Sequence, residues 1–416
     1  MSTKSSPQEL WNQLSEHLNK WYHQPDLEAL KISLCAAVTH YYPQELPFWL
    51  LIIGKSGTGK TAIAIQALQQ LPDAKIIGRV TPSCFLSSKE KGGKENSLLF
   101  RGDGGGHSQI WLFKDFTTFG SMRFEARAEV AAQLREIWDG ENSSDTGAGA
   151  HHWIGKVTAI AAATPEFEEY WAALRNLGDR FTTVRWREPS ESDPAFKKSR
   201  AQAGHQDEIR TRVHEIVHLL YRDKTQGAQM PEGPMMDRID TLAEIVAQMR
   251  VHVVRESDNG RSILRIPEAE FPTRLSMSFS QLIRTHMDIM HKIEADESDF
   301  SLARRLAFDT VPPIRRKILE YVPHDGEVTY GQILHSTRLP RNSLMRQIEE
   351  MVCLGILQES LSGTNEWSSR RASLEPDFKV KLDKAQATFR ANAAIALVPR
   401  RGRKASLNPD KAAYSD

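Results

Sequence analysis

The segment from Gly54 to Thr61 reads Gly-Lys-Ser-Gly-Thr-Gly-Lys-Thr and combines the residue types that a triphosphate site needs. Its spacing is G-x-x-x-x-G-K-[ST], in which glycines let the backbone curl so that successive N–H groups point at phosphate oxygens. In this pattern Lys60 reaches the β- and γ-phosphates, and Thr61 offers its hydroxyl to Mg²⁺. The pattern predicts a nucleotide cradle built from Gly54, Ser56, Gly57, Thr58, Gly59, Lys60 and Thr61.

A magnesium-bound triphosphate also needs a carboxylate on a neighbouring strand. The segment Ile110-Trp-Leu-Phe-Lys-Asp115 has four apolar residues followed by Lys114 and Asp115, as in a buried strand with an acidic residue near its end. We therefore expect Asp115 to hold Mg²⁺ together with Thr61. A solvated aspartate at a strand end is the alternative.

The residues around these motifs alternate between strand and helix patterns. The unbroken apolar run 48–53 leads into the cradle, as in a strand buried on both faces of a parallel sheet. Further strand patterns cover 75–80, 109–114, 157–163 and 181–186, and helix patterns cover 62–71, 124–138 and 166–176. This alternation predicts an α/β fold with a doubly wound parallel sheet. A chance match to the cradle motif is disfavoured because a strand precedes it and a helix follows it.

In this order of motifs the chain resembles the AAA+ ATPases, well over 46–187 and more weakly as far as residue 293. The resemblance implies ATP and Mg²⁺ as ligands, and catalytic roles for Lys60 and Asp115. It also implies that Thr164, after the strand 157–163, contacts the γ-phosphate or the attacking water. A helix cap is the alternative role for Thr164.

The same resemblance assigns two arginines to the nucleotide. Arg180, in Leu177-Gly-Asp-Arg-Phe181, is similar to the arginine that reaches the nucleotide of a neighbouring subunit. Arg274, in Pro272-Thr-Arg-Leu275, is similar to the arginine of the helical lid that contacts the nucleotide of its own chain. A homo-oligomer, as a ring or a spiral, is therefore expected. Surface ion pairs are the alternative for both arginines.

One subgroup of this family fits best. Between the strand of Asp115 and Thr164, the segment 133–155 is similar to the β-hairpin inserted there in minichromosome-maintenance helicases and in bacterial enhancer-binding activators. In those proteins the hairpin projects into the pore of a ring and touches DNA or a protein partner. The expected tip lies near 145–152, with Trp153 and Lys156 close by. An ordinary loop is the alternative.

The residue after Asp115 departs from the family pattern. The family usually has a glutamate there, which orients the attacking water, whereas this chain has Phe116, whose ring cannot accept a proton. Either hydrolysis is slow or another carboxylate substitutes, and Glu125, Glu129 and Glu136 lie downstream.

The segment after residue 305 resembles a winged helix. Helix patterns at 313–321, 327–334 and 339–352 are followed by strand patterns at 355–358 and 366–370. Such a fold presents its third helix to the DNA major groove. The expected DNA contacts are Arg341, Asn342, Ser343, Arg346, Arg370 and Arg371. Many winged helices bind protein instead.

A second motif has the spacing of a zinc-protease helix. His214-Glu-Ile-Val-His218 matches H-E-x-x-H, with two histidines on one helix face. An apolar stripe of Ile209, Val213, Ile216 and Leu220 instead favours a packed lid helix, and no third metal ligand is identifiable from the sequence.

Composition restricts the protein class. The 416 residues carry 54 Lys and Arg against 53 Asp and Glu, so the chain is neither a basic nucleic-acid coat nor an acidic disordered segment. Three distant cysteines predict no disulfide framework and favour a cytoplasmic protein. No apolar run approaches the roughly 20 residues of a membrane span, and no signal-peptide pattern is seen, so no membrane partner is expected.

The expected organisation has five parts. They are N-terminal helices (1–45), an α/β AAA+ core (46–188), a helical lid (189–305), a winged helix (306–375) and a flexible basic tail (376–416). Within the tail, Arg400–Lys404 could add phosphate contacts, although a solubilising role is the alternative.

The expected function is that of an oligomeric ATPase that remodels DNA, moves along it or loads a partner onto it. One alternative is a slow or non-hydrolysing ATP-gated switch that activates a separate effector in phage defence or in a mobile element. A transcriptional activator is the third interpretation.

Overall fold

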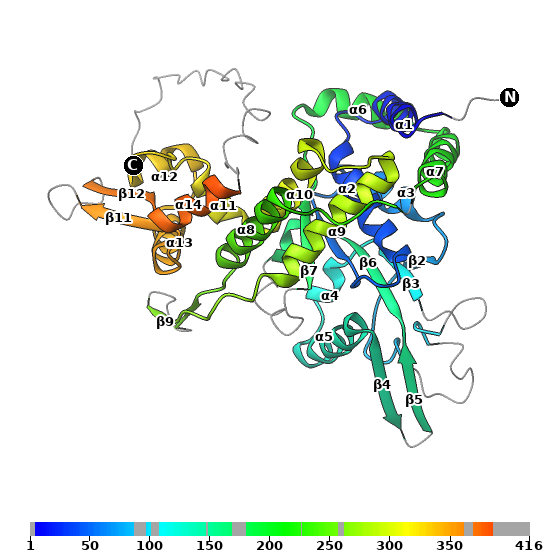
Figure 1. Cartoon of the computed structure of the whole chain (residues 1–416), viewed down its shortest axis with the longest axis horizontal. Helices are drawn as coiled ribbons and strands as arrows, with labels where there is room; N and C mark the ends of the chain where they lie inside the picture. The colour runs from blue at the N-terminus through cyan, green and yellow to red at the C-terminus, as the bar shows by residue number, and fades with distance from the viewer. Residues whose placement is uncertain are drawn as a thin grey trace, which may run out of the picture.

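The computed structural model describes residues 5–86, 97–100, 108–146, 149–168, 180–225, 227–256, 262–361 and 369–385. An α/β body contains the main sheet, and a smaller unit of helices and short strands follows in the C-terminal third of the chain (Figure 1). Three helices lie between the two, namely α8 (Pro234–Met249), α9 (Thr273–Met290) and α10 (Glu297–Thr310).

The main sheet has five parallel strands, which confirms the prediction of an α/β fold with a parallel sheet. Their order across the sheet is β2 (Ala74–Ile77), β3 (Ser108–Phe113), β6 (Lys156–Ala163), β1 (Trp49–Ile53) and β7 (Phe181–Arg185). Leu50 and Ile52 belong to one buried cluster, whereas Trp49, Leu51 and Ile53 belong to another. The apolar run is unbroken because both faces of β1 are covered.

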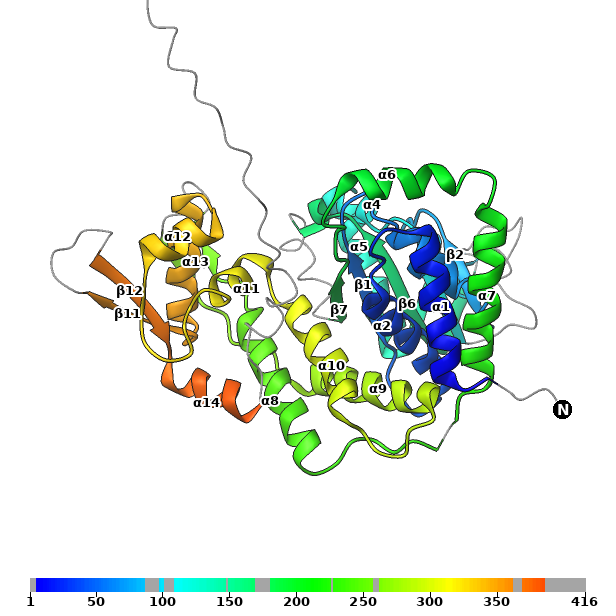
Figure 2. The same cartoon turned by 90° about the horizontal axis from the view of Figure 1, so that it is seen from above.

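Helices cover both faces of this sheet. One buried cluster contains residues of α1 (Pro7–Trp21), α2 (Leu27–Val38) and α7 (Gln206–Arg222), and the other contains residues of α5 (Phe124–Asp139). Figure 2 shows α1 and α7 lying side by side. The segment expected as N-terminal helices therefore shares its hydrophobic core with the sheet and with the helices that follow.

One helix prediction differs in detail from the structure. The predicted helix 62–71 is a π-helix, η2 (Thr61–Ile65), followed by the short α3 (Gln66–Leu68), so the helix ends before Pro72. Of the predicted helix 166–176, residues 166–168 belong to a 3₁₀ turn over 165–168, and the rest lies outside the described residues. Short helices α4 (Thr117–Gly120) and α6 (Ser192–Ala201) complete the body.

Two antiparallel hairpins leave the body. The predicted insertion before β6 is a hairpin of β4 (Glu141–Thr146) and β5 (Gly149–Ile154), which projects away from the sheet in Figure 1. Residues 147 and 148 at its tip lie outside the described residues. The other hairpin joins β8 (Val254–Arg255) to β9 (Ile263–Arg265) and precedes α9.

The C-terminal unit combines helices with a three-stranded antiparallel sheet. The helices are α11 (Pro313–Leu319), α12 (Tyr330–Thr337) and α13 (Arg341–Cys353). The strand order is β10 (Val328–Thr329), β12 (Arg370–Leu374) and β11 (Leu357–Leu361). The last strand was predicted at 366–370, but it covers Arg370–Leu374. Its pairing with β11 runs from Leu361 opposite Arg370 to Leu357 opposite Leu374.

The segment after this sheet corrects the prediction of a flexible tail from residue 376. Helix α14 (Pro376–Lys384) packs on α8, and Lys381 Nζ donates to Gln248 Oε1 at 3.1 Å. The predicted tail is therefore helical in its first nine residues, where Phe378 and Leu382 are buried. The basic segment Arg400–Lys404 lies outside the described residues. Among the described helices, none is both long enough and apolar enough to cross a membrane.

A buried ion pair links the sheet to the helices beside it. The Arg305 side chain on α10 is 5% exposed and that of Asp26, the N-cap of α2, is 1% exposed. Arg305 Nη1 donates to Asp26 Oδ1 at 2.7 Å, and the backbone N–H of Arg187 donates to Asp26 Oδ2 at 2.8 Å. Burial alone would raise the pKa of Asp26, but the hydrogen bonds from Arg305 and the backbone outweigh it and lower that pKa.

We predict that Arg305→Ala destabilises the protein by about 3–5 kcal/mol, because it leaves a buried carboxylate without its cation. Urea unfolding measures this difference. The control is Arg212→Ala on α7, whose half-exposed guanidinium should contribute no more than about 1 kcal/mol.

The stabilisation by the Arg305–Asp26 pair should decrease in acid. Because the folded state lowers the pKa of Asp26 below its usual 3.8, the stabilisation is complete above that pH and is lost as the pH falls through the lowered value. The difference in the free energy of unfolding between the native chain and Arg305→Ala should therefore become smaller in acid. A constant difference from neutral pH to pH 2 would contradict the assignment.

Candidate nucleotide-binding site

The predicted nucleotide cradle lies at the carboxyl-terminal edge of the sheet, on the same side as the predicted residues Asp115 and Thr164. Strands β1, β6 and β3 are parallel neighbours, so Gly54, Thr164 and Asp115 follow their ends on the same side. The Gly54 N–H donates to Ala163 O at 3.1 Å, and the Phe116 N–H donates to Ala162 O at 2.7 Å. These bonds hold the starts of the two loops against the end of β6.

The loop after β1 has the backbone shape that its glycines allow. Gly57 and Gly59 have φ values of +78° and +87°, a region that favours glycine. A side chain on Gly54 would begin 2.7 Å from Cβ of Trp186. Trp186 Nε1 also donates to Thr58 O at 3.1 Å, so the residue after β7 supports the loop. Ser56 is exposed on it.

Lys60 lies at the base of this loop, immediately before η2. Its residue surface is 7% exposed, and its ammonium lies 3.3 Å from the carbonyl oxygen of Lys55. Burial lowers the pKa of Lys60, and the charges of Asp115 and Glu166 oppose that effect. A largely buried cation beside a glycine-rich backbone is a suitable partner for anionic oxygens.

Hydrogen bonds connect the ends of β3 and β6. The Thr117 N–H donates to Asp115 Oδ1 at 3.0 Å, and the Thr164 N–H donates to Thr117 Oγ1 at 3.0 Å. The hydroxyls of Thr117 and Thr164 lie 3.3 Å apart. Thr117 was missed by sequence reasoning, although its position two residues after Asp115 was the available signal.

Glu166 is a second residue that sequence reasoning missed. It lies in the 3₁₀ turn that follows Thr164, and its carboxylate is exposed. A hydrogen bond from the Thr164 hydroxyl lowers the pKa of Glu166, and the charge of Lys60 acts in the same direction. Glu166 is therefore a charged carboxylate on the same edge of the sheet as Lys60 and Asp115.

The donor set fits Mg²⁺ held jointly with a triphosphate. Mg²⁺ prefers oxygen ligands and usually combines one or two carboxylates with substrate phosphates and water. Thr61 and Asp115 offer a hydroxyl and a carboxylate of this kind. Within the described part of the chain, no group of three or more His, Cys, Asp or Glu residues could hold a metal by itself.

The H-E-x-x-H motif is part of a packed helix. His214 Nε2 lies 2.7 Å from the carbonyl oxygen of Gln66, so this ring nitrogen connects α7 to α3. Ile209, Val213 and Ile216 of α7 are buried, as the apolar stripe indicated.

Phe116 points into the core and away from the cradle. It is 2% exposed, and its ring lies 5.1 Å from the ring centroids of Phe113 and Phe119 and 5.5 Å from that of Phe167. A polar side chain at this position would be buried among aromatic rings. Of the downstream carboxylates, Glu136 Oε2 accepts a hydrogen bond from Asn142 Nδ2 at 3.2 Å, and Glu125 and Glu129 are exposed on α5.

The two predicted arginines lie together at the other edge of the sheet. Arg180 directly precedes β7, whose first residue pairs with the first residue of β1. The guanidinium carbons of Arg180 and Arg274 lie 5.3 Å and 5.8 Å from the ring centroid of Trp138. Arg180 also pairs with Asp139 at 3.0 Å, and Arg274 with Glu270 at 3.5 Å. The structure thus groups Arg274 with Arg180.

The predicted DNA-contact residues lie on α13 and on β12 of the C-terminal unit. Arg341, Asn342 and Arg346 are exposed on α13, and Ser343 is half-buried. Two carboxylates pair with the predicted wing arginines, since Arg370 lies 3.2 Å from Glu359 and Arg371 lies 3.5 Å from Glu327. A cavity of about 410 Å³ is lined by residues of α12, α13, β11 and β12, namely Tyr330, Asn342, Met345, Arg346, Glu349, Glu359 and Arg370.

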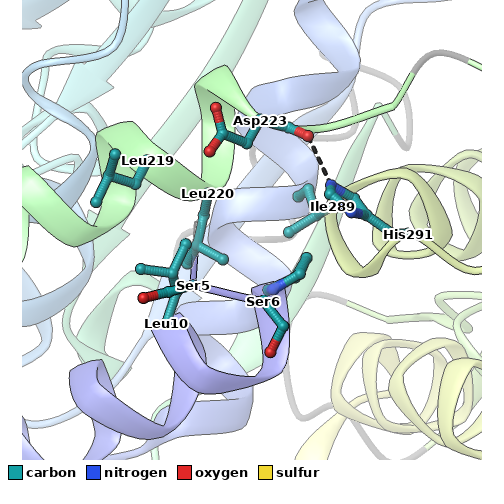
Figure 3. Close-up of a pocket in the computed structure, with 9 residues that line it drawn as sticks. Ser5, Ser6, Leu10, Leu219, Leu220, Asp223, Ile289 and His291 are labelled. Carbon is teal, nitrogen blue, oxygen red and sulfur yellow. Dashed lines mark hydrogen bonds between the residues drawn. The ribbon is translucent and has the colours of Figure 1, made fainter. Parts of the chain in front are cut away.

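Two further cavities lie in the body. One, of about 220 Å³, borders the helix that follows the cradle and includes Tyr22, Ala62 and Gln66 in its lining. The Tyr22 ring also faces Gly59, with its Cδ1 3.5 Å from where a Cβ would lie. The other, of about 270 Å³, lies between α1, α7 and the end of α9 (Figure 3). Its lining includes no cradle residue, and His291 Nε2 there lies 2.6 Å from Asp223 O.

Comparison of the chain with protein-family models and with curated proteins finds no match in either set.

We predict that Phe116→Glu destabilises the protein by about 3 kcal/mol or more and does not raise ATP turnover, because the carboxylate would be buried among aromatic rings. Guanidinium unfolding and an ATPase assay measure the two quantities. The control is Thr118→Glu, which introduces the same charge at an exposed position two residues away and should change stability by about 0.5 kcal/mol at most. A stable Phe116→Glu variant with faster turnover would refute this interpretation.

Proposed function

We propose that this protein is an AAA+-type ATPase that binds Mg-ATP at the carboxyl-terminal edge of its sheet and acts as an oligomer on DNA. The observation that carries the proposal is the grouping of the glycine-rich loop and Lys60 with Asp115 and Thr164 on adjacent parallel strands. Mg²⁺, when bound, would neutralise phosphate charge between Thr61 and Asp115.

The cavity beside η2 supports a placement for the rest of the nucleotide. The β- and γ-phosphates would lie in the loop near Lys60, and the α-phosphate near Thr61. The chain of the nucleotide then continues past Ala62 toward the cavity that Tyr22 and Gln66 line. The aromatic ring of Tyr22 offers a face for a base.

The separation of the two edges supports an oligomer. Strand β7 has five residues, so at about 3.3 Å per residue Arg180 lies roughly 15 Å from the edge that holds the cradle. Arg180 would therefore reach the nucleotide of a neighbouring copy. Because Arg274 shares the Trp138 ring with Arg180, we assign it to the same neighbouring nucleotide, in place of the contact within one chain that the family resemblance implied.

Assembly would change the partners of these arginines. In the single chain, Asp139 and Glu270 hold the two guanidinium groups near Trp138. A triphosphate from the next subunit carries more negative charge than one carboxylate and can accept several N–H donors from a guanidinium. We propose that, when the oligomer forms, the two arginines leave the carboxylates of Asp139 and Glu270 and bind phosphate oxygens of the neighbouring nucleotide.

Two projecting features support an action on DNA. The β4–β5 hairpin is anchored by Trp153, which is buried, and by Asn142, which bonds to α5, so it extends from a fixed base. The C-terminal unit combines α11, α12 and α13 with a small antiparallel sheet, as a winged helix does, and exposes Arg341 and Arg346 on α13. Glu349 and Glu359 near these arginines favour modest, salt-sensitive binding.

The second candidate is an ATP-gated switch with slow or no turnover, which activates a separate effector. The burial of Phe116 favours it, because the usual position of the water-orienting glutamate is closed to solvent. Turnover separates the two candidates, since both need ATP binding and assembly but the switch needs no repeated hydrolysis.

We predict that Mg-ATP shifts the native chain from monomer to oligomer in mass photometry, and that Lys60→Ala abolishes the shift because it cannot hold the phosphates. Arg180→Ala should bind ATP with a Kd within about threefold of native but lose turnover by about 10³-fold, since its role lies in the neighbouring site. Arg212→Ala, on the surface of α7, is the matched control. Full turnover by Arg180→Ala would contradict the assignment.

For DNA, we predict that the double variant Arg341→Ala/Arg346→Ala weakens binding and lowers the slope of log K against log salt by about 1 to 2, as expected when one or two phosphate contacts are lost. Fluorescence anisotropy with a labelled duplex at several salt concentrations gives the slope. The double variant Arg212→Ala/Arg222→Ala on α7 removes the same charge elsewhere and should keep the native slope. Equal slopes for all three proteins would exclude α13 as the DNA surface.

A further inference from the structure

We propose that Glu166 is the catalytic carboxylate that orients and deprotonates the water attacking the γ-phosphate of ATP. This inference rests on the proposed ATPase function and names a residue outside the position where the family resemblance places the base. Glu166 would accept the proton from water, which Phe116 cannot do. The base would then follow strand β6 instead of strand β3.

The position of Glu166 is set by residues on both sides of it. Thr164 precedes it at the end of β6, and the Thr164 N–H is held by Thr117 Oγ1 at 3.0 Å. Phe167 follows it, is 1% exposed and packs on Phe116. Glu168 then pairs with Arg185 at 2.5 Å. The turn is thus anchored before and after Glu166, while the Glu166 side chain itself remains exposed.

The surrounding charges favour the ionised form of Glu166, which can accept a hydrogen bond from water and orient it, although the lowered pKa also makes this carboxylate a weaker base. Glu166 accepts a hydrogen bond from the Thr164 hydroxyl, which lowers the pKa of Glu166 and keeps it ionised at neutral pH. Lys60, which would hold the γ-phosphate, interacts electrostatically with both Glu166 and Asp115. Asp115 is expected to bind Mg²⁺. Of the two carboxylates near Lys60, Glu166 is therefore the one that can contact the attacking water.

Among the described residues, two of the other candidate carboxylates are already engaged, and two are not. Glu168 is held by Arg185, and Glu136 is bonded to Asn142 at the base of the β4–β5 hairpin. Glu125 and Glu129 lie on the exposed surface of α5, in its first and second turns. They are the rival candidates that a direct test must include.

The step is a simple hydrolysis. The water oxygen forms a bond to the γ-phosphorus as the bond from that phosphorus to the bridging oxygen breaks, and its electron pair leaves with ADP. One proton of the water passes to the Glu166 carboxylate and then to the phosphate or to solvent. The products are ADP and inorganic phosphate, and no other reactant is required.

The test is Glu166→Gln, which retains an acceptor oxygen for the Thr164 hydroxyl but is a far weaker base. We expect turnover to fall by about 10²- to 10⁴-fold, while the Kd for ATP stays within about threefold of native. The second readout is the nucleotide recovered from the protein after incubation with Mg-ATP. It should be ATP for Glu166→Gln and mainly ADP for the native chain. Urea unfolding should give the same stability for both.

Rival variants complete the design. Glu125→Gln and Glu129→Gln should keep native turnover and yield mainly ADP. Loss of turnover in either of them, with Glu166→Gln unaffected, would overturn the inference. A native chain that binds ATP but never hydrolyses it, with or without DNA, would also overturn it and would favour the switch.

The two proposals can fail separately. If equilibrium dialysis shows no uptake of ATP by the native chain, the proposed function itself is wrong. If the native chain binds and hydrolyses ATP and Glu166→Gln does so equally fast, only the role of Glu166 is wrong.

Discussion

The parallel arrangement of β1, β6 and β3 is the constraint on which the rest of the molecule depends. Parallel strands place all their carboxyl ends on one edge, so Gly54, Thr164 and Asp115 become neighbours although more than a hundred residues separate the first from the second. Such a sheet must be covered on both faces, which explains the unbroken apolar sequence of β1 and the helices on either side. A site built in this way is supported by backbone hydrogen bonds rather than by long loops.

The same arrangement separates two sets of charges. The carboxyl-terminal edge holds Lys60 with Asp115 and Glu166, whereas the region around Trp138 holds Arg180 and Arg274 with their own carboxylates. A strand about 15 Å long stands between them. The distance means that one chain cannot bring both sets to one phosphate, and this is the physical reason for proposing a contact between subunits.

Buried arginines connect elements from different parts of the chain. Arg305 connects α10 to the start of α2 and forms ion pairs with three carboxylates. Arg315 of α11 donates to the carbonyl oxygens of Met249 and Val251 after α8, and to Glu350 of α13 at 2.9 Å. An unpaired charge at either place would be costly.

The sequence by itself determined the local features: the apolar strands, the turn-forming glycines before Lys60 and the amphipathic helices, because each depends on neighbours a few residues apart. It also indicated that H-E-x-x-H belonged to a packed helix. It left a hairpin and a loop as alternatives before β6, and the structure has the hairpin. Only the tertiary structure decided that Phe116 points into an aromatic cluster, that Arg274 lies beside Arg180, and that Glu166 and Thr117 join the cradle. These relations link residues from different strands and loops, so they depend on strand order and side-chain direction, which no spacing along the chain specifies.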